Sequence, residues 1–219
     1  MASKTNPSKT GAAKSVKKAA KKVPVKTNEA KKSVAKKAPL KKAVGKAVVA
    51  KAAPRANPLA DLLLQREVEQ FLYRQSAMLD NKRWQDYIDL FSEDGLYWMP
   101  PAAHYTTWQG QPAIFVEDPD FMTVRMKRIQ HPRAWSQVAE WATNHVVSNV
   151  EIEKVDANGD IHVLSRFHMM ELRRDDLRHF GGTYRHHLKR TAKGLRIKLQ
   201  RVDMFNSEAP YEYVLQVWV

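Results

Sequence analysis

Every aromatic side chain of this 219-residue sequence lies beyond residue 58. The six Trp, seven Tyr and seven Phe residues, together with all eight His residues, fall between residues 59 and 219. Large aromatic rings supply much of the buried area of a protein core, so a core can form only in this stretch. About 160 residues is an ordinary size for one domain. We therefore predict one folded domain at residues 59–219, preceded by a tail at residues 1–58.

The charge divides at the same boundary. The whole chain has 37 Lys and Arg against 23 Asp and Glu, a formal net charge of +14. Residues 1–58 hold 17 basic side chains and one acidic one, a net +16, which leaves −2 for residues 59–219. A strongly basic chain is typical of nucleic-acid binders. Here that interpretation applies at most to the tail, because the domain is nearly neutral.

The tail repeats paired lysines, small spacers and a proline, as in residues 17–24 and 31–39. The paired lysines place like charges one helical turn apart, and Pro24 and Pro39 would interrupt any helix. We therefore expect residues 1–58 to be disordered. Their composition resembles the Lys/Ala/Pro-rich tails of bacterial H1-like histones, which implies non-specific polyanion binding. The other interpretation is a solvated, dispensable extension.

Two absences narrow the class of protein. The chain has no cysteine, which excludes disulfides, thiolate zinc sites, a cysteine nucleophile and any iron–sulfur cluster held by this chain. The longest apolar run in the tail covers only residues 47–50, too short for a secretory signal or a membrane span. We expect a cytoplasmic protein without a membrane partner.

Hydrophobic periodicity predicts three helices in the first part of the domain. Apolar residues recur every three or four positions, with polar residues on the opposite face. Asn-Pro before the first helix is typical of a helix start, and Asp-Gly after the second is typical of a helix end. The expected helices cover 59–80, begun by Asn57 and Pro58; 84–91, ended near Asp94 and Gly95; and 121–129.

From residue 145 onward the period becomes two, as in β-strands. Tight-turn sequences at 156–160 and 191–194 separate successive strands. In the stretch after the second turn, the apolar residues change parity, which predicts a β-bulge near Gln200 and Arg201. The expected strands are 96–99, 146–155, 161–172, 181–189, 195–205 and 211–219, with an ordered loop over 100–120.

Helices followed by a curved antiparallel meander predict an α+β domain. We expect a cystatin-like cone in which the N-terminal helices pack on the concave face of the sheet. Outward positions such as His162, Leu164, Arg166, His168 and Met170 mix apolar and basic side chains, which favours a protein contact over free solvent.

The eight histidines raise the question of a metal site. A non-haem iron site needs two histidines and a carboxylate that converge. His162 and His168 share a strand face, but six residues of extended strand separate them by roughly 20 Å. His186 and His187 point to opposite faces of their strand. We therefore predict no metal-binding residue.

A cone-shaped fold can also hold the general base of a hydratase or isomerase. Tyr97, His104, His145 and Tyr184 are the residues that would line such a cone. The alternative is that they are packed or interface polar groups, and no short spacing pairs a His with an Asp. Neither a phosphate-binding Gly-rich loop nor a Gly-x-Ser-x-Gly motif is present. The sequence therefore nominates no catalytic and no cofactor-binding residue.

Several motifs occur together and in order along the domain. They are Val68–Asp80, Arg83-Trp84, Leu90-Phe91, Asp94–Pro100, Arg125–Ile129, Asn144–Glu151, His179–Gly182, Ile197–Val202 and Tyr213–Val219. As a set, they resemble the small (beta) subunit of bacterial aromatic-ring-hydroxylating dioxygenases. The C-terminal motif, Tyr213–Val219, resembles the benzoate/anthranilate branch of that family.

The resemblance implies an NTF2-like fold, like that of nuclear transport factor 2 and scytalone dehydratase. It implies no cofactor on this chain. The expected partner is an alpha subunit carrying a Rieske 2Fe-2S cluster and mononuclear Fe(II), in an alpha3beta3 assembly with a beta trimer inside it. The sequence departs from the family in two places: the 58-residue tail is additional, and residues 137–143 lack the Pro and Arg often found there.

We therefore interpret the chain as a non-catalytic subunit of a dioxygenase that cis-dihydroxylates an aromatic acid. The alternative is a self-sufficient NTF2-like hydratase or isomerase with a His/Tyr-lined cone. A third hypothesis is a nucleic-acid-binding module that acts through the basic tail.

Overall fold

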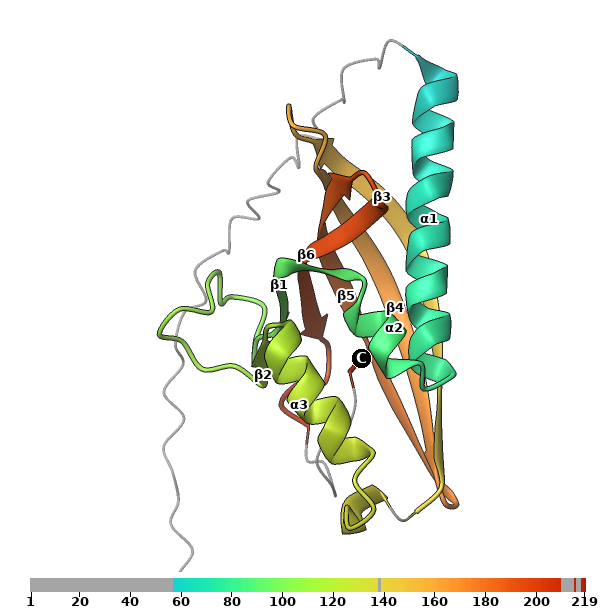
Figure 1. Cartoon of the computed structure of the whole chain (residues 1–219), viewed down its shortest axis with the longest axis vertical. Helices are drawn as coiled ribbons and strands as arrows, with labels where there is room; N and C mark the ends of the chain where they lie inside the picture. The colour runs from blue at the N-terminus through green and yellow to red at the C-terminus, as the bar shows by residue number, and fades with distance from the viewer. Residues whose placement is uncertain (1–56, 138, 210–214, 216–217) are drawn as a thin grey trace, which may run out of the picture. The chain divides into compact units, whose positions relative to one another are not determined.

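The computed structural model of the chain describes residues 57–137, 139–209, 215, 218 and 219 (Figure 1). The predicted disordered tail therefore lies outside the described residues except for its last two positions, as does most of the strand predicted at 211–219. In the described part, no helix is both long and apolar enough to cross a membrane. The elements are α1 (Pro58–Asp80), α2 (Trp84–Ile88), β1 (Phe91–Met99), β2 (Phe115–Glu117), α3 (Pro119–Ile129), the 3-10 turn η1 (Trp135–Gln137), β3 (Trp141–Val155), β4 (Ile161–Arg173), β5 (Asp176–Thr191) and β6 (Gly194–Met204).

The long first helix forms as its sequence predicts. The Asn57 side chain caps it by accepting a hydrogen bond from the Ala60 N–H at 3.3 Å, and Pro58 occupies the first turn. Val68, Phe71, Leu72 and Leu79 lie at helical spacing and are buried. In Figure 1 the helix runs alongside the sheet, over β3.

The second helix is shorter than predicted. It ends at Ile88, and Phe91, which the sequence placed in the helix, opens β1. The Leu90 carbonyl accepts a hydrogen bond from the Ile197 N–H at 2.8 Å, so strand pairing begins where a further helical turn would have formed. Gly95 lies within β1 and does not end a helix. A Cβ there would lie 2.8 Å from the Ile197 carbonyl oxygen, so the glycine permits close approach of two backbones.

One six-stranded sheet, ordered β2-β1-β6-β5-β4-β3, forms the other layer. Strands β3 to β6 make the predicted antiparallel meander. β1 joins it by parallel pairing with β6, and β2 forms within the predicted loop at 100–120 and pairs antiparallel with β1. β3 and β5 each begin five residues before their predicted starts, at Trp141 and Asp176. The predicted α+β fold with helices over a curved, largely antiparallel sheet is confirmed.

The predicted bulge in β6 exists, but earlier than expected. His187 pairs with Leu199 and Leu188 pairs with Ile197, so Lys198 is the extra residue. Gln200 therefore faces the core together with Val202, whereas Leu199 leaves the core face. The sequence pattern misplaced the bulge because it placed the apolar Leu199 in the core. The structure places the polar Gln200 there.

Two adjacent glycines in β5 differ in the space around them. A Cβ on Gly182 would lie 2.1 Å from the Asp203 carbonyl oxygen and 2.9 Å from the Phe167 ring, whereas a Cβ on Gly181 would make only ordinary contacts, from 3.6 Å outward. We therefore expect Gly182→Ala to lower the free energy of unfolding by about 2 kcal/mol or more, because the β6 backbone must move. Urea unfolding measures the effect, with Gly181→Ala as the control; equal losses in the two variants would contradict it.

Candidate functional site

A histidine and a carboxylate meet inside the fold, between α1 and β3. The His145 Nδ1 atom lies 2.6 Å from an Asp80 carboxylate oxygen, and the His145 backbone N–H donates to the other oxygen at 3.0 Å. The Thr143 hydroxyl also donates to Asp80, at 3.0 Å. Asp80 stands in the last turn of α1, where the helix dipole disfavours an acid. These three contacts explain why the acid is tolerated there.

The electrostatics of this pair follow from its contacts. Burial opposes the charged carboxylate, but the hydrogen bonds from the side chain and backbone of His145 outweigh it and lower the pKa of Asp80. The His145 side chain is only 1% exposed. A carboxylate that orients an imidazole is the arrangement of a general base. Here it also ties the end of α1 to β3.

The four residues predicted to line the cone separate into two groups. Tyr97, His145 and Tyr184 are buried, whereas His104 is exposed and contacts the Tyr105 ring in a tilted arrangement with centroids 4.3 Å apart. Burial raises the pKa of Tyr184 well above its ordinary value, so its hydroxyl keeps its proton. The Tyr97 hydroxyl oxygen accepts a hydrogen bond from the Val219 N–H at 3.2 Å.

Two hollows on the described part lie away from this pair. One, of about 560 Å³, lies between the start of β1 and the β5–β6 turn and includes Asp94 and Lys189. The other, of about 520 Å³, follows α3 and includes Arg128, His131 and Trp135. Neither is lined by Asp80, His145 or Tyr184. Neither hollow therefore gives a substrate access to the His145 imidazole.

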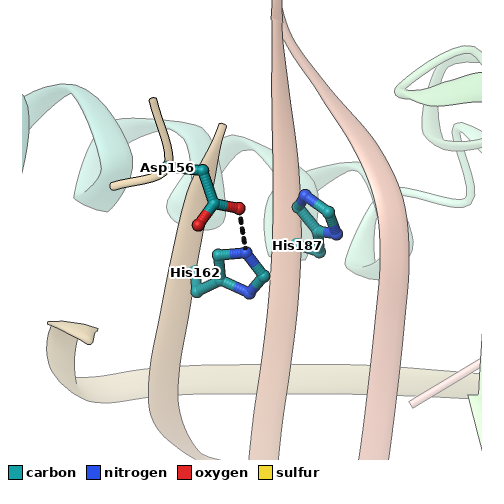
Figure 2. A group of neighbouring side chains, drawn as sticks. All are labelled: Asp156, His162 and His187. Carbon is teal, nitrogen blue, oxygen red and sulfur yellow. Dashed lines mark hydrogen bonds and ion pairs between the residues drawn. The ribbon is translucent and has the colours of Figure 1, made fainter. Parts of the chain in front are cut away.

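The histidines on the sheet form cross-strand pairs that spacing along one strand does not reveal. His162 on β4 lies directly opposite His187 on β5, and their rings stack with centroids 4.2 Å apart. Asp156, in the turn before β4, places a carboxylate oxygen 2.8 Å from the His162 Nε2 atom (Figure 2). Along its own strand, the histidine that shares a face with His162 is His168, six residues away. The predicted hairpin turn places Asp156 next to the start of β4, and pairing of β4 with β5 places His187 opposite His162. These two features together would have indicated the group.

His186 faces the interior and His187 the exterior, as alternation along a strand requires. Burial lowers the pKa of His186 to about 3. The Tyr184 ring meets it edge-on at 5.6 Å. This histidine is therefore neutral in the folded protein at ordinary pH.

More than half of this chain matches the model of one protein family. The model of the family described as "Ring hydroxylating beta subunit" matches residues 74–209, more than half of the chain. The chain belongs to the ring-hydroxylating beta-subunit family. The resemblance expected from the motifs in the sequence is thereby confirmed.

Curated relatives of this ring-hydroxylating beta subunit carry related names. It is 33% identical to the biphenyl 2,3-dioxygenase subunit beta of Rhodococcus jostii over 49% of this chain and 62% of that protein. It is 27% identical to the 2-halobenzoate 1,2-dioxygenase small subunit of Burkholderia cepacia, over 64% and 87% of the two chains. The match thus spans less than two thirds of the biphenyl subunit's length.

Solved structures show the same fold. The beta subunit of benzoate 1,2-dioxygenase from Burkholderia mallei has a TM-score of 0.55 at 23% identity, covering 74% of this chain and all of that chain. A chain of a naphthalene 1,2-dioxygenase structure has a TM-score of 0.59 at 16% identity, covering 76% and 95%. At these identities the likeness establishes the architecture of the beta subunit, and the chemistry has to be argued separately.

The buried His186 makes a prediction about acid stability. Unfolded histidine takes up a proton near pH 6.5, whereas the folded pKa is about 3, so the unfolded chain binds more protons between these values. Below pH 6.5, we expect His186 to lower the free energy of unfolding by about 1 kcal/mol for each pH unit. This contribution should be absent from the His186→Leu variant.

Urea midpoints measured between pH 4 and 7 test this difference in slope. The exposed His104→Leu variant is the control, because it should keep the slope of the parent protein. Parallel pH profiles for the parent and His186→Leu would contradict the assignment.

Proposed function

We propose that this chain is the non-catalytic small (beta) subunit of a Rieske non-haem iron aromatic-ring-hydroxylating dioxygenase. The observation that carries the proposal is the family match over residues 74–209, supported by the shared fold of solved beta subunits. The oxidoreductase reaction, cis-dihydroxylation of an aromatic acid, would then take place on the alpha subunit. The named substrates of relatives range from biphenyl to 2-halobenzoate, and we place the chain's own complex in aromatic catabolism in the cytoplasm.

The absence of catalytic, cofactor and iron-binding residues in the beta subunit is part of this proposal. A Rieske cluster needs two cysteines as well as two histidines, and the chain has no cysteine. The cluster is therefore assigned to the alpha subunit, and the family resemblance places the mononuclear iron there with it. Three alpha and three beta chains, with the beta chains in contact, would form the oxygenase.

Exposed apolar side chains provide surfaces for such an assembly. The first turns of α1 carry three leucines that are 62–64% exposed, and α3 exposes Phe121 and Val124 to a similar extent. The outer face of the sheet adds Val146, Met170 and Leu172. Large exposed apolar groups are typical of subunit contacts. The leucines are Leu59, Leu62 and Leu63.

Co-expression with the alpha subunit tests the assembly. We expect the two chains to co-purify as a complex that contains iron and has the visible absorbance of a Rieske cluster, and we expect the beta chain alone to contain no redox iron. Replacing Leu59, Leu62 and Leu63 by Ser should weaken assembly without unfolding the domain, because these side chains are largely exposed. Stoichiometric redox iron in the beta chain alone would contradict the proposal.

The alternative of a self-sufficient hydratase or isomerase depends on the Asp80–His145 pair. That pair has the correct chemistry, but its imidazole is almost fully buried and neither described hollow reaches it. Asp80 also uses three hydrogen bonds to join α1 to β3. The pair therefore supports a structural role better than a catalytic one.

The basic tail is a separate element in this proposal. We place the domain boundary at residues 58/59, with the net charge of +16 before it and −2 after it. Such a tail attracts polyanions by releasing counterions and does not read base sequence. We expect the full chain to bind DNA with an affinity that falls steeply with salt, and to lose binding when the tail lysines become Gln. Fluorescence anisotropy measures this, and binding that persists in the Gln variant would assign it to the domain.

A further inference from the structure

Three potential metal ligands converge on the outer side of the sheet, near the β3–β4 turn. They come from three different segments: Asp156 from the turn, His162 from β4 and His187 from β5. One ligand atom from each lies within 4.8 Å of the other two, and Figure 2 shows the carboxylate above the His162 ring, with the His187 ring to one side on the neighbouring strand. Among the described residues, no other group of three such side chains converges.

The backbone holds these side chains in place. Antiparallel pairing of β4 with β5 sets His162 directly opposite His187. The turn is closed by a hydrogen bond of 2.8 Å from the Asp156 N–H to the Asp160 carbonyl, and Gly159 supplies the positive φ of +86° that it needs. Strands and a tight turn thus preorganise the backbone of the site, and only the side chains have to turn.

The local charge also suits a divalent cation. A second carboxylate, Asp160, is nearly buried and lies 3.2 Å from the His187 Nε2 atom, the place of a carboxylate that orients a metal-bound histidine. Both carboxylates have lowered pKa values, Asp156 through hydrogen bonds from Lys154 and His162 and Asp160, against its burial, through hydrogen bonds from Asn158 and His187, so together they carry −2. Two lysines oppose a cation here: the Lys154 Nζ atom lies 2.9 Å from the other Asp156 oxygen, and the positive charge of Lys198 acts on His187.

We propose that Asp156, His162 and His187 bind a divalent first-row transition metal of the zinc type. Imidazole with carboxylate suits zinc, nickel or copper, whereas calcium and magnesium prefer oxygen ligands alone. Zinc bonds of about 2.0–2.2 Å require the ligand atoms to draw closer than 4.8 Å. The stacked rings must turn toward each other, and side chains that are 25% and 21% exposed have the freedom to do so. Such an ion would link the β3–β4 turn to β5.

Isothermal titration of the tag-free full chain with zinc chloride tests the site. We expect one zinc ion per chain and a rise in the melting temperature on binding. His162→Ala, His187→Ala and Asp156→Asn should each weaken binding at least about tenfold. Lys154→Met should tighten binding several-fold, because it removes the competing charge, and a purely structural role for these residues would not produce that gain.

A second stacked pair on the same two strands provides the matched control. His168 and His179 stack at 5.3 Å, and no carboxylate completes a group of three there among the described residues. His168→Ala should therefore leave zinc affinity unchanged. Zinc binding that survives in the His162→Ala, His187→Ala double variant, or its absence from the parent chain, overturns the proposal. Either result leaves the assembly role untouched, because that role does not depend on this ion.

Discussion

One carboxamide oxygen joins the three parts of the interior. The Gln200 Oε1 atom, on β6, accepts hydrogen bonds from the Gln75 side chain of α1 at 2.8 Å and from the Tyr87 hydroxyl of α2 at 2.9 Å. All three side chains are buried, so loss of the acceptor would leave two donors without water or partner. Gln200 reaches this position only because the bulge at Lys198 changes the parity of β6. The β-bulge in β6 therefore determines how the two helices are positioned on the sheet.

Other buried polar contacts continue this pattern toward both ends of the sheet. Asp80 and His145 join α1 to β3, and the buried Glu117 carboxylate of β2 accepts from the Trp218 Nε1 atom at 2.9 Å and pairs with Arg125 of α3. The Asp80–His145 and Glu117–Trp218 contacts link segments far apart in sequence, whereas Glu117 and Arg125 belong to neighbouring elements. Buried hydrogen bonds of this kind make the interior around them rigid. Rigidity of this kind suits a protein whose proposed task is to hold partner subunits.

Local patterns predicted the elements whose energetics are local. The cap at Asn57 and the apolar spacing of α1 gave the first helix, and the turn at 156–160 gave the β3–β4 hairpin. The prediction was wrong where distant groups decide the outcome: pairing with Ile197 ends α2 before Phe91, and a polar Gln200 takes an inward position. The Asp80–His145 contact spans 65 residues, and the His162–His187 contact depends on the pairing of two strands.

The parallel pairing of β1 with β6 has a consequence for how the domain forms. Phe91 pairs with Ile197 and Trp98 with Arg201, so these two neighbouring strands of the sheet are separated by about a hundred residues of chain. Closing so long a loop carries an entropic cost that local contacts do not offset, and folding slows accordingly. On the ribosome, the apolar side chains of β1 must wait until β6 has emerged. Until then β1 has only the short strand β2 as a partner, and its other edge is open to pairing with other chains, which exposes the nascent chain to aggregation.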